Sequence, residues 1–575
     1  MSAAGRRCDR RLIQPPSAAS ENSVRPRLRA AWTLPQEAAL RHNGGSTERG
    51  ERSMTEQQRD LLSQLAEVLG DKTAVIEDLP DGRKRMWSFA EFEAQANRLA
   101  SLLVEHGAQP RDKVIWCGQN SPWVVAIIHA ARKIGVVAVP LNYRLTEEEA
   151  AYVVDNSDAV LAFVDAEFAG LFQGIRPHTP QLREVLIYDG TPAEGQLAAD
   201  ELIPSMDASE LALRIEPGTA GTMIYTSGTT GKPKGAVRTG IGDPEQIARM
   251  IEFYGYRPDD VYLTTGPLYH SGPSGFMAIA QMLGNTVVLQ KKFDAEDWLR
   301  LVDTYKVTSS FAAPAPVRMI CNLPADVLAK YDTSSMRVMI ANAAPWSYAL
   351  KLMYLEHFPE DSLFEVYGST ELGVNTILRP EHQRAKPGSC GQAAPGVEIC
   401  LFDDDGKPVT DVGKEGELYV RSASVFTTYH KAQDKYEADR REGGWQTVGD
   451  IAYVDAEGFY YICDRKKDMI ISGGVNIYPA EIESALETHP DIVDVAVFGI
   501  PNEEWGEQVH AHVVTRSGAT LDAEAVRHFA REHLAGYKVP RSVEFVTEIP
   551  RTGTGKILKR DLRKPYWEGH TSRVV

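Results

Sequence analysis

The chain has the sequence YTSGTTGKPKG at residues 225–235, directly after a strand-like stretch at residues 222–225. Glycines let backbone N–H groups converge on an anion, hydroxyls add hydrogen-bond donors, and lysines offset the charge of a triphosphate. A flexible surface turn would explain only the glycines, so we predict a phosphate-binding loop. It is not a Walker A loop, because Pro233 follows Lys232 where that pattern has Ser or Thr. The candidate phosphate contacts are Thr226, Ser227, Gly228, Thr229, Thr230, Gly231, Lys232 and Lys234.

Helical and strand-like patterns alternate on both sides of this loop. Such alternation predicts βαβ units and a mostly parallel sheet. Near residues 415–421 the apolar positions switch to period two, which predicts a smaller antiparallel sheet. The expected helices are 89–103, 123–133, 298–305 and 348–358, and the expected strands are 113–117, 136–140, 287–290 and 336–341.

The C-terminal stretch has the pattern of a separate small unit. Helices are expected at 480–488 and 523–534, strands at 493–500 and 509–514, and a charged tail after them. The fold class is therefore α/β, with a large multi-subdomain N-terminal α/β body and a small mobile C-terminal α+β domain. We expect the body at 54–463, a hinge at 464–467 and the C-terminal domain at 468–575, although the charged run at 464–468 is by itself more typical of a solvated turn.

The first 53 residues differ in composition from the rest, with ten arginines, no lysine and five acids. An organelle transit peptide would have this acid-poor character. Four prolines between Pro15 and Pro35 would interrupt the amphipathic helix that such a peptide needs. We therefore expect residues 1–53 to be a disordered or non-native leader, with Met54 as the working start.

Composition excludes several classes. The chain of 575 residues exceeds the size of a single core, and its 43% hydrophobic and 25% charged residues are typical of globular proteins. A net charge of −17 argues against a nucleic-acid binder. No uninterrupted apolar stretch reaches the ~18 residues of a membrane span. Six cysteines without paired spacing favour reduced thiols and a cytoplasmic location.

A second motif, YGSTELG at residues 367–373, supplies a hydroxyl and a carboxylate. Alone, such a pair is more typical of a helix start or a solvated loop. Together with the loop at 225–235, it resembles the adenylate-forming superfamily of acyl-CoA synthetases, luciferases and nonribosomal adenylation domains. The resemblance implies nucleotide contacts from Tyr367 and Gly368, a Thr370 near the α-phosphate and a Glu371 that holds Mg²⁺. Attack of a carboxylate on the α-phosphate brings anions together, so a metal and a fixed donor would offset their repulsion.

Two further motifs follow in the order of the family. Residues 447–450, TVGD, resemble its ribose-binding motif and retain Asp450, although Val448 replaces the usual threonine. Residues 464–474, DRKKDMIISGG, resemble its hinge and the loop behind it. By this resemblance Arg465 contacts ribose or phosphate, the hinge residue is Lys467, and Gly473 and Gly474 line the tunnel for the thiol.

Residues 550–557, PRTGTGKI, resemble the last core motif of the family. This resemblance places Lys556 at the position of the catalytic lysine. Its ammonium would stabilise charge that accumulates only in the adenylation transition state. The segment Ala343, Ala344 and Pro345 falls where the family packs a glycine-rich segment between adenine and the acyl pocket, and the missing glycines affect pocket shape. His270 falls at the pocket entrance, where the family often has a catalytic histidine; in isolation it is more typical of a loop or core histidine.

The resemblance covers residues 54 to about 562 and implies an AMP-forming acid–thiol ligase that uses ATP, Mg²⁺ and CoA. The motifs are similar to those of fatty-acid and bile- or steroid-acid CoA ligases, and aromatic acids remain open. Transfer to a carrier-protein phosphopantetheine is the enzymatic alternative, and a nonenzymatic nucleotide-binding protein is the other. The expected partners are a small carboxylic acid, ATP and CoA, without nucleic acid or an integral membrane segment. A homodimer is left open.

Overall fold

The computed structural model describes residues 60–568 apart from short gaps. The gaps are residues 212, 214, 217, 227–231, 241–242, 343–345, 473–474, 503–504 and 552–556. The expected leader, residues 1–53, lies outside the described residues.

The N-terminal part of the body is built on an eight-stranded sheet in the order β19-β9-β8-β4-β3-β5-β6-β7. The strands from β8 to β7 in this order pair in parallel, whereas β8 and β9 form an antiparallel hairpin that β19 extends. The hairpin carries the phosphate-loop motif between its strands. The bounds are β3 Lys113–Cys117, β4 Val137–Pro140, β5 Ala159–Asp165, β6 Glu184–Tyr188, β7 Leu197–Ala198, β8 Gly221–Thr226, β9 Lys234–Thr239 and β19 Thr428–Tyr429.

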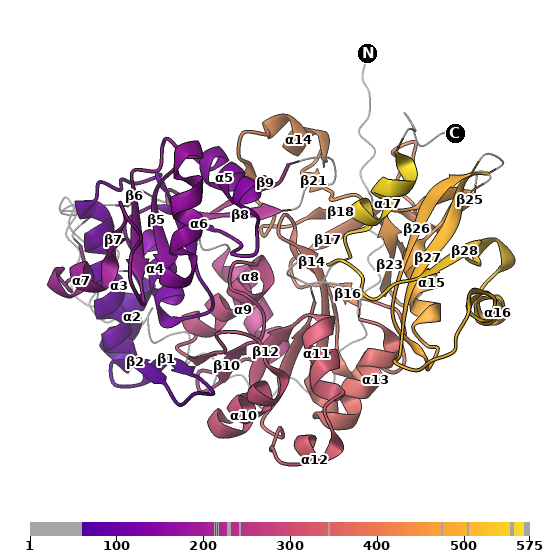
Figure 1. The fold of residues 1–575 in the computed structure, drawn as a ribbon, viewed down its shortest axis with the longest axis horizontal. Helices are drawn as coiled ribbons and strands as arrows, with labels where there is room; N and C mark the ends of the chain where they lie inside the picture. Colours follow the sequence, from indigo (N-terminus) through magenta and orange to yellow (C-terminus); the bar gives the residue numbers. More distant parts are fainter. Residues whose placement is uncertain are drawn as a thin grey trace, which may run out of the picture.

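A second, nine-stranded sheet has the order β16-β15-β14-β13-β12-β10-β11-β1-β2. Its central strands are parallel and its edges antiparallel. Figure 1 shows helices α10 to α13 packed beside it, in the lower part of the view. The bounds are β1 Thr73–Asp78, β2 Lys84–Ser88, β10 Val261–Thr264, β11 Thr286–Leu289, β12 Ser309–Ala312, β13 Val338–Ala341, β14 Leu363–Ser369, β15 Gly373–Leu378 and β16 Gln392–Ala393.

A six-stranded antiparallel sheet completes the body, in the order β20-β21-β18-β22-β23 with β17 on the other edge of β18. The period-two pattern of residues 415–421 correctly predicted its central strand. The bounds are β17 Glu398–Phe402, β18 Gly416–Arg421, β20 Arg440–Arg441, β21 Trp445–Gln446, β22 Asp450–Val454 and β23 Tyr460–Arg465.

The C-terminal sheet is separate from the other three, in the order β25-β24-β27-β26 with β28 parallel to β27. It lies on the right in Figure 1, with α15 and α16 beside it and α17 toward the body. Its core includes Ile482, Val495, Val497, Ala511 and Val526. The bounds are β24 Ile470–Ser472, β25 Val475–Ile477, β26 Ile492–Asn502, β27 Gly506–Thr515 and β28 Ser542–Phe545.

Local capping chemistry sets the helix ends. Ser88 begins α3 with a capping box, because its hydroxyl accepts from the N–H of Glu91 and the Glu91 carboxylate accepts from the N–H of Ser88. Helix α4 begins differently: the hydroxyl of Ser121 accepts from the N–H of Val124, and Pro122 occupies the first turn. The bounds are α2 Leu61–Leu69, α3 Phe89–Glu105, α4 Pro122–Lys133, α5 Glu147–Asn156, α6 Ala169–Ile175, α7 Ala199–Leu202, α8 Pro244–Tyr254, α9 Ser271–Met282, α10 Ala295–Tyr305, α11 Pro314–Cys321, α12 Ala325–Leu328, α13 Tyr348–His357, α14 Gln433–Ala438, α15 Pro479–Leu486, α16 Ala523–His533 and α17 Lys559–Trp567.

The predicted fold class is confirmed: a large α/β body is followed by a small α+β domain. Two local expectations were wrong. The tail after residue 534 contains strand β28 and helix α17, which we missed because α17 is rich in charged residues and contains Pro565. The charged run at 464–468 is not wholly a turn, since Asp464 and Arg465 pair with β22. The domain boundaries and the mobility of the small domain stay predictions.

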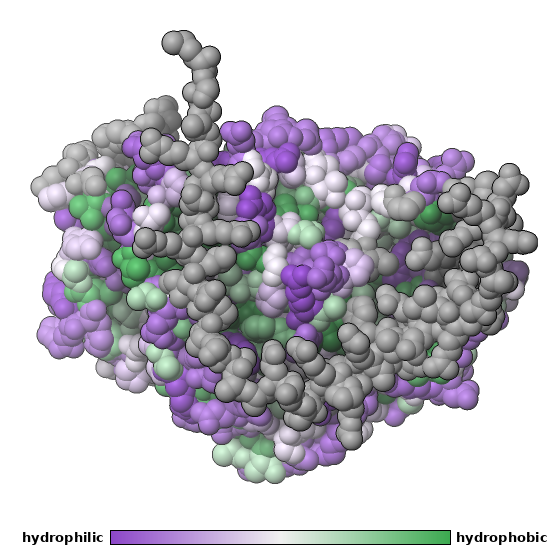
Figure 2. Space-filling model, turned by 180° about the vertical axis from the view of Figure 1, so that it is seen from behind, coloured by the Kyte–Doolittle hydropathy of each residue, from purple (hydrophilic) through white to green (hydrophobic). Residues whose placement is uncertain are grey.

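Polar and apolar side chains are mixed on the surface. Figure 2 shows hydrophilic side chains over much of one face, with smaller hydrophobic areas between them. In the part of the chain that the structure describes, no helix combines the length and apolarity needed to cross a membrane. The described cysteines, Cys117, Cys321, Cys390, Cys400 and Cys463, form no disulfides.

Candidate active site

The ends of the phosphate-loop motif are fixed by the hairpin of β8 and β9. Thr226 is the last residue of β8 and lies directly opposite Lys234, the first residue of β9. The hydroxyl of Thr226 donates to Oε1 of Glu371 at 2.9 Å. This bond joins two motifs that lie 145 residues apart in the sequence.

Glu371 is held at a fixed position by neutral donors. Its Oε1 also accepts from the hydroxyl of Tyr429 at 3.1 Å, and its main-chain carbonyl accepts from the N–H of Phe426 at 2.7 Å. Its exposed fraction is only 8%. A carboxylate beside the hydroxyl of Thr226 is a set of hard oxygen donors, which is what Mg²⁺ prefers. The residues present therefore fit the predicted metal.

Thr370 lies beside Glu371 and is bound from both sides. Its hydroxyl is 2.8 Å from the hydroxyl of Ser271, at the start of α9. Its carbonyl accepts from the guanidinium of Arg238 at 3.0 Å, and that guanidinium also donates to the carbonyl of Ser424. Burial lowers the pKa of Arg238, and the charge of Glu371 opposes that shift. The hydroxyl of Thr370 is thus positioned by the neutral hydroxyl of Ser271.

The backbone at Gly368 allows this motif to fold back on itself. A Cβ at position 368 would lie 2.1 Å from the carbonyl oxygen of Gly373. Such a distance is impossible for a side chain, so the close approach of β14 and β15 requires glycine. The predicted site residues that follow Gly368, Thr370 and Glu371, depend on this turn for their direction.

Asp450 is held between a phenol and a guanidinium. The hydroxyl of Tyr367 donates to Oδ2 at 2.5 Å, and Nε of Arg465 lies 3.5 Å from Oδ1. Asp450 and Arg465 are paired neighbours on β22 and β23, which explains why they meet. Burial and the charge of Asp450 raise the pKa of Tyr367 well above its usual value. Tyr367 therefore stays a hydrogen-bond donor.

The substitution of Val448 for threonine is offset by the preceding residue. The hydroxyl of Thr447 donates to the carbonyl of Leu418 at 2.8 Å and accepts from the N–H of Gly449 at 2.9 Å. These bonds fix the turn before Asp450. Thr447 therefore supports the backbone next to Val448, although it was not predicted as a site residue.

Several of these groups line one cavity, which has a volume of about 1440 Å³. Its polar part is lined by Thr226, Gly368, Thr370 and Arg465, and by Lys467 from the predicted hinge. Burial lowers the pKa of Lys467 to about 8. The residues that follow the predicted catalytic lysine, from Ile557 to Asp561, line the same cavity, so the C-terminal domain closes it.

Comparison with known proteins agrees with this geometry. Residues 62–430 match the family described as AMP-binding enzyme, and residues 481–556 match the AMP-binding enzyme C-terminal domain. The chain belongs to the AMP-binding enzyme family. The predictions of an enzyme, of the adenylate-forming superfamily and of its acyl-CoA ligase branch are thereby confirmed.

Individual relatives cover nearly the whole chain. An indoleacetate–CoA ligase of Aromatoleum aromaticum is 35% identical over 84% of this chain and 93% of its own length. A long-chain-fatty-acid–CoA ligase of Mycobacterium tuberculosis is 33% identical over 88% and 98%. The crystal structure of ATP-bound MatB from Rhodopseudomonas palustris is 28% identical, with a TM-score of 0.79 over 88% of this chain and 98% of that one.

Three further predicted site residues of this AMP-binding enzyme, Lys232, Lys234 and His270, lie against aromatic rings. Nζ of Lys232 lies 4.7 Å from the ring centre of Tyr152, and Nζ of Lys234 lies 5.9 Å from that of Tyr429. His270 immediately precedes α9, lines the cavity and packs on Tyr269 with ring centres 4.3 Å apart. The remaining predictions lie outside the described residues and stay predictions: Ser227, Gly228, Thr229, Thr230, Gly231, Ala343, Ala344, Pro345, Gly473, Gly474 and Lys556.

Sequence analysis missed Arg238, Ser271, Tyr429 and Thr447. These residues hold the motif residues in place through hydrogen bonds. Arg238 follows the phosphate loop on β9, so its proximity to the loop was a usable signal. Tyr429 lies 58 residues from Glu371, and only the pairing of β19 with β9 brings it near.

Proposed function

We propose that this AMP-binding enzyme is an ATP-dependent carboxylate–CoA ligase that acts on a large, mainly apolar acid. One observation carries the proposal: the phosphate-facing motifs and a long apolar wall line the same cavity. Its volume of about 1440 Å³ exceeds the ~300–1,000 Å³ of a typical single-ligand pocket. Room for both a nucleotide and an acid supports a two-substrate reaction.

The length of the apolar wall indicates the size of the acid. Helix α9 lines the cavity from Ser271 to Met282, a length of about 17 Å at the rise of an α-helix. Met250 of α8 and Phe311 of β12 line the same space. Near the far end of α9, Gln281 and His129 add polar groups. A long acyl chain or a multi-ring acid matches this wall better than acetate does.

In the first half-reaction, a carboxylate oxygen of the acid attacks the α-phosphorus of ATP, the bond between the α- and β-phosphates breaks, and pyrophosphate leaves. Thr370 and the predicted Lys556 would donate to the α-phosphate and carboxylate oxygens. Glu371 with Thr226 would hold Mg²⁺, which neutralises phosphate charge when bound. Asp450 would accept from the ribose hydroxyls. These roles place fixed donors where negative charge accumulates.

In the second half-reaction, the CoA sulfur attacks the acyl carbon, the thiol proton goes to solvent, and AMP leaves with the electrons of the broken anhydride bond. We propose that the C-terminal domain, residues 468–575, turns about a hinge at 464–467 between the two steps. The start of β24 five residues after Arg465 supports a boundary at this place. A cytoplasmic location, oligomeric state and a role in lipid metabolism stay predictions.

The test is a screen of acids of graded length, aromatic acids and steroid acids, with AMP release and product mass as readouts. We expect acid-dependent AMP release that requires CoA, and a product with the mass of the acyl-CoA. A product that forms only when a carrier protein replaces CoA would favour the carrier-loading alternative. Absence of pyrophosphate exchange with every acid would contradict adenylation itself.

The acid pocket can be tested with a matched pair of glycine variants. A Cβ at Gly275 of α9, which lines the cavity, would meet no atom within 4 Å, and the same holds for Gly170 of α6, which is not among the lining residues. Gly275→Leu should lower kcat/KM at least about tenfold for the longest accepted acids and leave the shortest unaffected. Gly170→Leu should change neither. Equal losses for all acids with Gly275→Leu would contradict the assigned pocket.

A further inference from the structure

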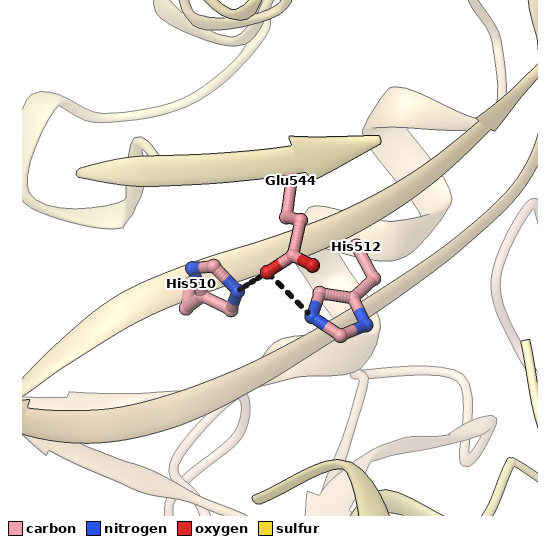
Figure 3. Close-up of side chains that lie close together, drawn as sticks. All are labelled: His510, His512 and Glu544. Carbon is pink, nitrogen blue, oxygen red and sulfur yellow. Dashed lines mark ion pairs between the residues drawn. The ribbon is translucent and has the colours of Figure 1, made fainter. Parts of the chain in front are cut away.

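Two histidines and a glutamate meet on one face of the C-terminal sheet. His510 and His512 alternate along β27, so both point to the same face. Glu544 on the neighbouring parallel strand β28 lies directly opposite His512. Figure 3 shows the three side chains pointing toward one another. Strand register alone therefore creates this cluster.

Helix α17 covers the cluster and adds a fourth candidate ligand atom, a hydroxyl oxygen. The hydroxyl of Tyr566 lies 3.1 Å from Nε2 of His510, 3.2 Å from Nε2 of His512 and 2.7 Å from Oε2 of Glu544. Oε2 of Glu544 is in turn 3.9 Å and 3.5 Å from the two Nε2 atoms. Ligands bound to zinc at 2.0–2.1 Å in a tetrahedron lie about 3.3 Å apart. The distances between the candidate ligand atoms, from 2.7 Å to 3.9 Å, lie on both sides of that value.

The surroundings orient the imidazoles as they do in metal sites. Nδ1 of His510 lies 2.7 Å from the hydroxyl of Ser542, so its Nε2 faces the cluster. The ring of Phe498 packs edge-on against both imidazoles. His510 and His512 are buried, with exposed fractions of 4% and 8%, whereas Glu544 is exposed. An ion can therefore reach a site whose walls are already in place.

We propose that His510, His512 and Glu544 bind a divalent transition metal, with Zn²⁺ as the favoured ion and Tyr566 at the fourth position. Two imidazole nitrogens and one carboxylate oxygen suit zinc, whereas magnesium and calcium take oxygen ligands. None of the four side chains is among the described residues that line the active-site cavity. The site is therefore separate from the predicted magnesium at Glu371.

Binding at this place fastens α17 to the sheet. The helix begins at Lys559, three residues after the predicted catalytic Lys556, and Nε1 of Trp567 near its end donates to the carbonyl of Gly499 in β26 at 3.1 Å. A metal that joins Tyr566 to β27 and β28 adds a further attachment. We expect zinc to raise the midpoint of thermal unfolding, because a ligand that binds only the folded state stabilises it.

The experiment is a zinc titration of the full chain, freed of metal with a chelator, against a chromophoric competitor. Wild type should bind one Zn²⁺ per chain at this site, and Co²⁺ should give the visible absorption of a tetrahedral complex. Glu544→Gln should weaken binding by about tenfold or more, and so should His512→Gln. The matched control is His528→Gln, because His528 lies on the exposed surface of α16 beside Glu532.

The variants keep the proposal falsifiable. Glu544 is exposed, so its replacement by glutamine should leave the fold intact even if the buried His512 does not tolerate substitution. Loss of the site in Glu544→Gln with retention in His528→Gln supports the proposal. Equal zinc affinity in wild type and Glu544→Gln overturns it and leaves a hydrogen-bonded cluster around Tyr566. An anomalous diffraction peak at the zinc edge that lies away from His510 and His512 also overturns it.

Discussion

The body and the C-terminal domain contribute to one cavity in different ways. In the body, Glu371 and Thr370 are held by hydrogen bonds from separate strands and a helix. On the C-terminal side, cations near the cavity are paired with nearby acids: Lys559 with Glu483 at 2.9 Å, and Arg563 with Asp468 at 2.5 Å.

This difference teaches how one cavity could serve two half-reactions. Glu371 and Thr370 could change position only if their hydrogen bonds to separate strands and a helix broke. Groups held in this way suit contacts that both half-reactions need. Each of these two C-terminal cations pairs with an acid of the same domain. The proposed rotation of that domain would therefore keep each pair together and would not leave a buried charge unpaired. Contacts between the parts include Arg318 with the carbonyl of Val493 at 2.9 Å and the hydroxyl of Tyr478 with Oε2 of Glu415.

The largest expected effect concerns the C-terminal side. Lys556→Ala should reduce acid-dependent ATP–pyrophosphate exchange about 10³-fold, because the variant lacks a donor to charge that develops in the transition state. Transfer from preformed acyl-adenylate to CoA should continue, which provides the internal control. Exchange at the wild-type rate would show that another residue has this role.

On the body side, Glu371→Gln should reduce exchange about 10²-fold and raise the magnesium concentration needed for half-maximal rate. Glutamine keeps the shape and can still accept from Thr226 and Tyr429, so the fold should persist. Glu544→Gln is the matched control and should leave exchange unchanged. An unaltered magnesium dependence in Glu371→Gln would contradict the assigned metal contact.

The hinge can be tested with two changes at one position. Lys467→Pro should slow thioester formation about tenfold or more while adenylation persists, because proline fixes φ and restricts rotation. Lys467→Ala removes the side chain and leaves the backbone free. If both variants slow thioester formation equally, the side chain matters and the hinge assignment fails.

Asp450→Asn should weaken both half-reactions by about tenfold, since a charged acceptor contributes roughly 1.5–3 kcal/mol to a hydrogen bond. The equal effect follows from the position of Asp450 in the body, held by Tyr367 and Arg465. Half-reaction rates measured separately provide the check. A loss confined to one half-reaction would contradict the proposed division between body and C-terminal domain.

The smallest expected effect is a pH dependence. The pKa of Lys467 is lowered to about 8 by burial, and Asp468, Arg465, Arg563 and Asp450 also act on it. Its ammonium loses a proton as pH rises through about 8, so the KM for ATP should rise about threefold above that pH. Lys467→Arg keeps the charge and should flatten the profile between pH 7 and 9.5. Identical profiles would exclude Lys467 as the cause.

The sequence by itself determined the family, the order of the motifs and most of the α/β elements. This was possible because each motif is contiguous: the phosphate loop, residues 367–373 and residues 464–474 carry their glycines, hydroxyls and charges side by side. Period and composition likewise located strands such as β3, which was predicted with its observed bounds, Lys113–Cys117. Helix α17 was not predicted, because its many charged residues and Pro565 obscure the apolar periodicity of a helix.

Only the tertiary structure decided what supports the motifs. Tyr429 reaches Glu371, and Glu544 reaches His512, through strand pairings that no local pattern encodes. Register places side chains from distant segments within a few ångströms, and a shift of one residue would turn each to the opposite face. The proposed acid pocket has the same origin, since its walls come from α8, α9 and β12. The motif residues and the chemistry they imply could therefore be predicted from the sequence. The residues that hold them in place and the walls of the proposed substrate pocket could be found only in the folded structure.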